Sequence, residues 1–226
     1  MPPVGRARDG LRRRRLDETP VSVPVSSVIR PADDRRRGFV RRVLAAPDRV
    51  HRVANVPALT VDVVPLKSGR RHGLFDGRRI LVNRTSPARE LALVHEIGHV
   101  LDYFAIGAVH GRYASEAGEP VLDEWRHAVE DSRTLRLLRE TRAALPPIGS
   151  SQGIYIDYLL RPSELFARSY AQWLASAPAD DTLIEQLEQL RRAEPVAPQL
   201  VQWEPGDFDA IRVAYGRLME QLAWTL

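Results

Sequence analysis

The sequence contains no cysteine and only one lysine, Lys67, among its 33 basic residues. The absence of cysteine excludes disulfide bonds and a thiol nucleophile, and it leaves the cellular compartment undecided. No stretch approaches 18 consecutive apolar residues, so we expect no membrane span. The N-terminus also lacks the apolar segment of a signal peptide. We therefore expect a cytoplasmic protein by default, with non-classical export as an effector as the open alternative.

Positive charge is concentrated near the N-terminus. Residues 1–55 hold 14 arginines and six acidic residues, whereas acidic residues are in excess in the remainder of the chain. Residues 1–30 have several prolines and no stable hydrophobic period, which predicts a basic, disordered arm. No zinc finger, helix-turn-helix pattern or aromatic RNA-binding motif accompanies the arginines, so we expect no specific binding of nucleic acid. We expect residues 31–226 to form one domain.

The most informative segment is His-Glu-Ile-Gly-His at residues 95–99. Residues four apart lie on one face of a helix, so His95 and His99 can direct two imidazoles at one metal ion. Glu96 lies about 100° around the same helix, beside the metal rather than on it. There its carboxylate can take a proton from a water molecule, which is the arrangement of a zinc hydrolase.

The residues around this segment predict a helix. Ser86 is a candidate N-cap, Pro87 suits the first helical position and Gly107 offers a stop. Apolar side chains from Leu93 to Phe104 form one arc, and the histidines and Asp102 lie on the other. Asp102 is either a residue that orients an imidazole or an ordinary helical aspartate.

A zinc site needs a third protein ligand. Glu164 lies in the first turn of a predicted helix that begins at Pro162 or Ser163, although a glutamate there commonly serves only to complement the helix dipole. His110 and His127 are other possible donors. The next alternatives are acidic residues between the two motifs: Glu116, Glu119 and Glu124.

The His-Glu-x-Gly-His-x-x-Asp pattern, followed by Glu-x-Phe-Ala at 164–167, resembles the gluzincin branch of the zincin-like metallopeptidases. It is most similar to the catalytic-domain type of anthrax lethal factor and to related phage- and toxin-associated peptidase domains. The resemblance covers about residues 58–176. It implies that His95, His99 and Glu164 bind Zn²⁺ and that Glu96 is the general base. It also implies an oxyanion-stabilising tyrosine, either Tyr158 or Tyr155.

The remaining pattern predicts an α+β fold with a small, mostly antiparallel sheet and a helical C-terminal part. Residues 58–65 alternate as a strand, and residues 73–83 read as a hairpin with its turn at Asp76-Gly77. Residues 154–158 form a short apolar segment. Helices are expected at 33–46, at 119–144 (as two helices), from Pro162 or Ser163 to about Ala175, and at 180–193 and 206–223.

These observations together predict a zinc metalloendopeptidase that acts on a protein or peptide. Strand 79–83 could hold an extended substrate by β-augmentation. Two alternatives stay open: a catalytically silent zincin-fold module that binds or regulates, and a basic nucleic-acid-associated protein in which the histidine motif is incidental. The sequence does not indicate the oligomeric state.

Overall fold

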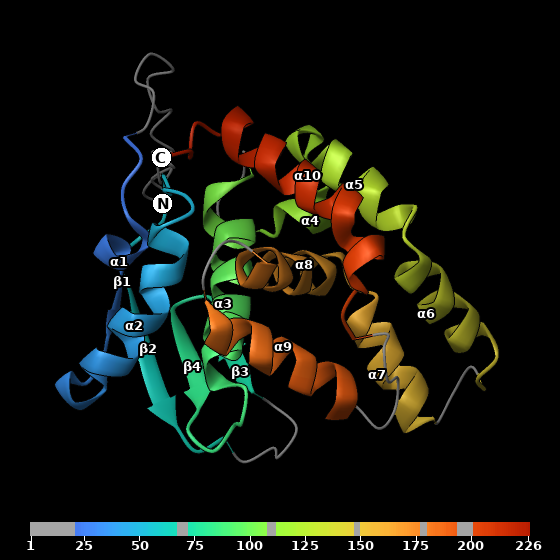
Figure 1. The fold of residues 1–226 in the computed structure, drawn as a ribbon, viewed down its shortest axis with the longest axis horizontal. Coiled ribbons are helices and arrows are strands. Elements are labelled where there is room, and N and C mark those ends of the chain that lie inside the picture. The colour runs from blue at the N-terminus through green and yellow to red at the C-terminus, as the bar shows by residue number, and fades with distance from the viewer. Residues whose placement is uncertain (1–20, 67–71, 108–111, 147–149, 177–179, 194–200) are drawn as a thin grey trace, which may run out of the picture.

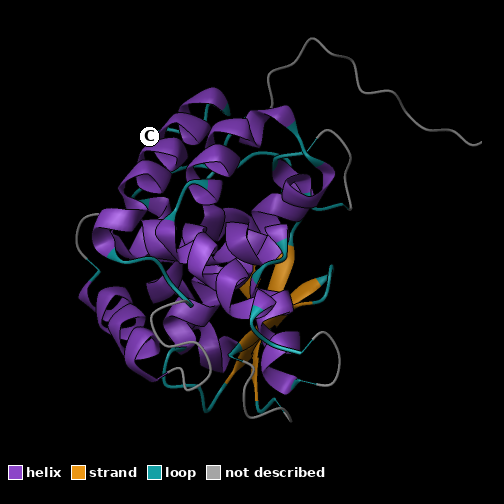
Figure 2. Cartoon of the chain, turned by 90° about the vertical axis from the view of Figure 1, so that its right-hand side faces the viewer, coloured by secondary structure: helices purple, strands orange, loops and turns teal. Residues whose placement is uncertain are grey.

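The computed structural model describes residues 21–66, 72–107, 112–146, 150–176, 180–193 and 201–226. Its described part is a mixed α+β structure, as the sequence predicts, in which helices dominate and the strands gather on one side (Figures 1 and 2). The α-helices are α1 (Val25–Val28), α2 (Arg37–Asp48), α3 (Arg89–Val100), α4 (Ala114–Ala117), α5 (Asp123–Glu130), α6 (Arg133–Ala143), α7 (Ser151–Leu159), α8 (Pro162–Ser176), α9 (Asp181–Ala193) and α10 (Pro205–Gln221).

Three shorter helical segments complete this set. η1 (Asp34–Arg36) and η3 (Pro120–Leu122) are 3₁₀ turns, and η2 (Leu101–Ala105) is a π-helical continuation of α3. The strands are β1 (Ile29–Pro31), β2 (Leu59–Val64), β3 (Gly73–Phe75) and β4 (Arg79–Asn83). None of the helices in the described ranges is long and apolar enough to cross a membrane.

The sheet has the strand order β1-β2-β4-β3, and its pairing corrects the prediction of a mostly antiparallel sheet. β1 pairs with β2 in parallel and β2 pairs with β4 in parallel, so only β3 and β4 are antiparallel. The first parallel pair is possible because α2 provides the crossover that parallel neighbours require. The hairpin was predicted correctly, with Gly77 at φ 84° in its turn. Its pattern did not reveal that β4, rather than β3, pairs with β2.

The boundary between the N-terminal arm and the folded domain was predicted near residue 30, but residues before this point already belong to the fold. Val23 exchanges two backbone hydrogen bonds of 2.8 Å with Val53, and Ile29 is buried where β1 pairs with Leu59 of β2. The strand β1 has three residues and is too short to show a hydrophobic period, and Pro20 and Pro24 before it make the segment resemble a linker. The segment from residue 21 onward therefore belongs to the fold, while residues 1–20 of the predicted arm lie outside the described residues.

The start of α3 also differs from its prediction. The helix begins at Arg89, with Ala88 at the N-cap position, rather than at Ser86 and Pro87. The Ser86 hydroxyl instead accepts a hydrogen bond of 3.1 Å from the Ala88 amide, in the turn that precedes α3. At the other end, the helical path continues through η2 and turns away at Ile106 and Gly107, close to the predicted stop.

Buried side chains from both the sheet and the helices form one main hydrophobic core, and α3 and α8 lie at its centre. Figure 1 looks almost along α8, which lies beside α3. A Cβ atom added to Gly98 of α3 would lie 2.9 Å from the Cα of Ala167 in α8. These two small residues therefore let the helices approach closely at the level of His95 and His99.

Candidate metal centre

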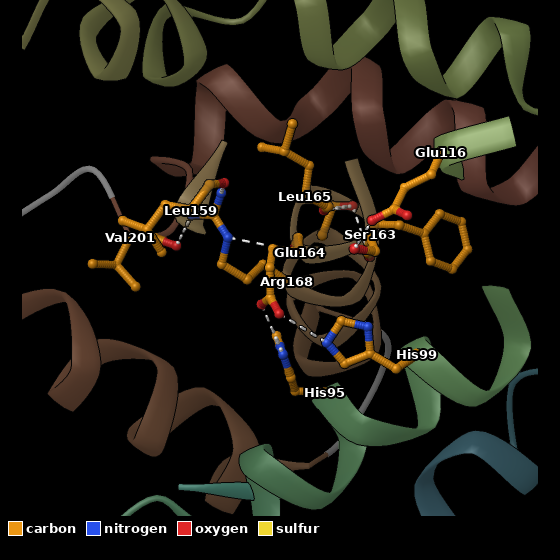
Figure 3. A network of polar contacts seen from close by, with 11 residues as sticks. His95, His99, Glu116, Leu159, Ser163, Glu164, Leu165, Arg168 and Val201 are labelled. Atoms are coloured by element: carbon orange, nitrogen blue, oxygen red, sulfur yellow. Dashed lines mark hydrogen bonds and ion pairs between the residues drawn. The ribbon is translucent and has the colours of Figure 1, made fainter. Parts of the chain in front are cut away.

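Two helices bring His95, His99 and Glu164 together. α3 presents both imidazoles on one face, one helical turn apart, and the first turn of α8 directs Glu164 at them (Figure 3). His95 Nε2 lies 3.4 Å from Glu164 Oε2, and His99 Nε2 lies 3.3 Å from Glu164 Oε1. One donor atom from each of the three residues can be chosen so that all lie within 4.8 Å of one another. A single ion can therefore be placed between them.

Burial and mutual charge set the electrostatics of this cluster. Glu164 and His99 are buried, and the His95 side chain is 19 % exposed. Burial alone would raise the pKa of Glu164, but the adjacent imidazoles of His95 and His99 outweigh it, so that pKa lies well below its ordinary value. The carboxylate consequently stays ionised, as a metal ligand must be.

Two buried polar atoms in the cluster have no hydrogen-bond partner among the described residues: Oε2 of Glu164 and Nδ1 of His99. An unpaired buried polar atom costs free energy, so such atoms need an explanation. For Oε2, which faces His95, a cation between the two groups would supply the missing partner. Two imidazole nitrogens and one carboxylate oxygen are a ligand set that zinc accepts, with a fourth position open. The residues present therefore fit zinc.

Glu96 lies beside the cluster and outside it. Its side chain is buried below β3, where the amide of Phe75 donates a hydrogen bond to the carboxylate. A Cβ atom added to Gly73 would lie only 2.7 Å from Oε1 of Glu96. Burial raises the pKa of Glu96, partly offset by the nearby charges of His95 and His99. A carboxylate with a raised pKa next to the cluster can act as a general base.

Asp102 does not hydrogen-bond to an imidazole. Its two carboxylate oxygens accept hydrogen bonds from the Ser115 amide at 2.8 Å and the Ser115 hydroxyl at 2.6 Å. Burial raises the pKa of Asp102 to about 6, against the opposing effect of these two bonds. Asp102 therefore ties η2 to α4, and Nδ1 of His99 obtains no acceptor from it.

The two candidate tyrosines both lie on α7 and differ in what they reach. The Tyr158 hydroxyl is within hydrogen-bonding reach of the Glu164 carboxylate. The Tyr155 ring stacks on the Tyr158 ring, with centroids 6.3 Å apart. Burial and the adjacent Glu164 raise the pKa of Tyr158, so its hydroxyl remains a hydrogen-bond donor. Tyr158 therefore contacts the cluster through Glu164.

Of the other donors considered from the sequence, those that the structure describes do not join the cluster. His110 lies outside the described residues. His127 lies on α5 and is not among the grouped ligand atoms of the described residues. Glu116 accepts a hydrogen bond of 2.7 Å from the Ser163 hydroxyl, which links α4 to α8 beside Glu164. Glu119 and Glu124 are likewise outside the group.

Sequence reasoning missed two residues next to the cluster. The Tyr113 ring packs edge-on against the His99 ring, with centroids 5.7 Å apart. Arg168 is fully buried one turn after Glu164 and donates hydrogen bonds to the carbonyls of Leu159 (2.6 Å) and Val201 (2.7 Å), as Figure 3 shows. The spacing of four from Glu164 could have indicated Arg168. No sequence signal indicated Tyr113.

The predicted position of the substrate strand is wrong. β4 is paired on both sides, with β2 and β3, so it offers no free edge for β-augmentation. The edge strand next to Glu96 is β3. A hairpin alone does not show which of its strands lies outermost.

Comparisons with known proteins gave no relationship to report. No family model matches the chain, and neither the curated proteins nor the solved structures contain a match to it.

Proposed function

We propose that this protein is a zinc-dependent metalloendopeptidase of the gluzincin type, with a zincin-like fold. The observation that carries the proposal is the convergence of His95, His99 and Glu164 from two helices while Glu96, next to His95 in sequence, lies outside the ligand set. A metal-binding group without a base would support only a binding module. A base beside three such ligands supports hydrolysis.

His95, His99 and Glu164 would hold Zn²⁺. When bound, zinc supplies Lewis-acid polarisation of a carbonyl and lowers the pKa of water to about 7. Glu96 takes the proton of the attacking water onto its carboxylate and later delivers it to the departing amine nitrogen. Its hydrogen bond from the Phe75 amide fixes the carboxylate for this transfer. The Tyr158 hydroxyl donates a hydrogen bond to the oxygen that gains negative charge.

β3 is the strand we propose for holding the substrate, in place of β4. It forms the edge of the sheet on the side of Glu96, and an extended peptide can add to a free sheet edge through backbone hydrogen bonds. A protein or an unfolded peptide segment is therefore the proposed substrate class.

Metal content and peptide cleavage test this proposal. We expect one zinc per purified chain, cleavage of a peptide library, and loss of cleavage after chelation that zinc restores. Glu96→Gln should keep zinc and reduce cleavage by a factor on the order of 10² to 10⁴. Glu164→Ala should lose both zinc and cleavage. Glu220→Gln, an exposed site on α10, is the matched control and should change neither.

The outcomes separate the candidate functions. Zinc without cleavage in the wild-type chain would favour a silent binding module. Absence of zinc would contradict the site itself and favour an incidental histidine motif. Cleavage that persists undiminished in Glu96→Gln would contradict the proposed base.

A further inference from the structure

α7 carries an exposed apolar stripe. Ile154 is 68 % exposed and Tyr158 is 38 % exposed, although both side chains are large and hydrophobic. They are four residues apart in a helix, so they lie on one face, one turn from each other. Exposed large apolar groups next to a functional site are candidates for contact with a ligand.

Tyr158 connects this stripe to the metal centre. Its hydroxyl reaches the Glu164 carboxylate, while part of its ring remains accessible. A chain that passes the cluster can therefore continue along α7 over Tyr158 and Ile154. Arg168 holds this end of α7 in place, because its buried guanidinium donates to the Leu159 carbonyl.

A positive charge lies at the end of the stripe. The guanidinium carbon of Arg161 is 5.8 Å from the centre of the Tyr158 ring, and the residue is exposed. Within the described part of the chain, Arg161 forms no ion pair with a carboxylate. The nearest acidic residue on α7, Asp157, is instead bound to Arg142 at 2.7 Å. The charge of Arg161 is thus available to a ligand.

We infer that Ile154, Tyr158 and Arg161 form a substrate subsite for a peptide segment that carries an aliphatic side chain and an acidic side chain. The inference rests on the proposed function for the identity of the occupant as a peptide. Charge complementarity to Arg161 selects the acidic side chain, and the stripe selects the aliphatic one. The four-residue step from Ile154 to Tyr158 spans about 6 Å of helix at 1.5 Å per residue, and the Arg161 guanidinium carbon lies 5.8 Å from the centre of the Tyr158 ring. The subsite is therefore at most about 12 Å long, which an extended peptide covers in about three to four residues, and this sets the separation of the two side chains.

Binding to amidated decapeptides tests this inference directly. Each fluorescein-labelled peptide contains one Leu and one Glu, Gln or Lys, separated by one to five positions in either order. The amidated C-terminus leaves the Glu side chain as the only carboxylate of the peptide itself, and the charge of the fluorescein label is the same in all peptides. Fluorescence anisotropy uses the zinc-loaded, full-length Glu96→Gln protein, so that the peptides stay intact during the measurement.

We expect the Glu peptide with a separation of about three to bind about two- to fivefold more tightly than its Gln counterpart, the range for an exposed ion pair. The preference should disappear in 0.5 M salt, because exposed charges are screened. Added to the same background, Arg161→Gln should abolish it and Arg161→Glu should transfer it to the Lys peptide. Ile154→Ser should weaken all Leu peptides. Arg41→Gln, which removes an exposed arginine on α2, is the matched control and should bind as the parent does.

Failure of the inference and failure of the proposed function give different results. Equal binding of Glu and Gln peptides, or a preference unchanged in Arg161→Gln, would overturn the subsite even if the wild-type protein cleaves peptides. An Arg161-dependent preference in a protein that cleaves nothing would support the subsite and contradict the peptidase. Thermal unfolding of each variant shows that the binding differences do not come from loss of structure.

Discussion

Substitution of Gly98 by alanine tests whether the close contact of α3 and α8 forms the candidate metal centre. The added methyl group would lie 2.9 Å from the Ala167 Cα and 3.1 Å from a ring carbon of Tyr170. Carbon atoms in favourable contact are about 3.5–4.0 Å apart. The two helices must therefore separate by roughly half an ångström or more at this level, since the nearest obstacle is backbone and cannot rotate away.

Two opposing terms set the effect on stability. Replacing glycine by alanine inside a helix contributes about 0.8–1.0 kcal/mol of stabilisation. Overpacking a dense core costs about 1–3 kcal/mol. The net expectation is a loss of about 0–2 kcal/mol, which leaves the protein folded. The cluster is more sensitive, because metal–ligand distances tolerate only about 0.2 Å. Moving Glu164 away from His95 and His99 should weaken zinc binding by about 10- to 100-fold, the range seen when the support of a ligand is disturbed.

Gly216→Ala is the matched control, because Gly216 lies inside α10 and a Cβ atom there meets nothing within 4 Å. Urea unfolding should show that this control is more stable than the wild type, and competition with a chelator should show unchanged zinc affinity. If Gly98→Ala gains the same stability as the control and binds zinc equally well, the helices are not held apart by the added methyl group. The close approach of α3 and α8 would then not determine the geometry of the metal centre.

Three further predictions concern other parts of the chain. Burial lowers the pKa of His51 to about 4, so the folded state favours the neutral imidazole. The free energy of unfolding is therefore highest above pH 6.5, the pKa of an unburied histidine, and it should fall by about 3 kcal/mol as the pH is lowered from 7 to 4. His51→Gln cannot be protonated, so urea unfolding over this pH range should show that the variant lacks this loss. Gly73→Ala should displace the Glu96 carboxylate and lower kcat of peptide cleavage by at least tenfold while the melting temperature stays near that of the wild type; unchanged kcat would contradict the contact. A chain that starts at residue 32 should lose stability because β1 is removed, whereas one that starts at Val21 should melt like the full chain, as differential scanning calorimetry can show.

The sequence predicted the parts of the fold that depend on local pattern. The hairpin at 73–83 and helices α8, α9 and α10 follow from alternation, turn residues and helical period, and they were placed within a few residues. His95 and His99 were placed on one helical face for the same reason. Local pattern does not determine which strands pair, so the parallel order β1-β2-β4 was missed. The partnership of Asp102 with Ser115 was missed because it joins residues through a tertiary contact.

Gly98 and Ala167 differ from the other residues of the two motifs because their small size is explained by helix packing. The contact between them shows that both are small because α3 and α8 lie close together there. Any pair of helices that approach so closely would favour small residues at this point, whether or not a metal were bound between them. The likeness of His-Glu-x-Gly-His and Glu-x-Phe-Ala to a peptidase family therefore rests partly on packing. The proposed metal binding depends on His95, His99 and Glu164, and the proposed hydrolysis depends on Glu96. Packing alone does not require the Glu164 carboxylate to face two imidazoles with one of its buried oxygens lacking a hydrogen-bond partner. The experiments on Glu96 and Glu164 therefore decide the function.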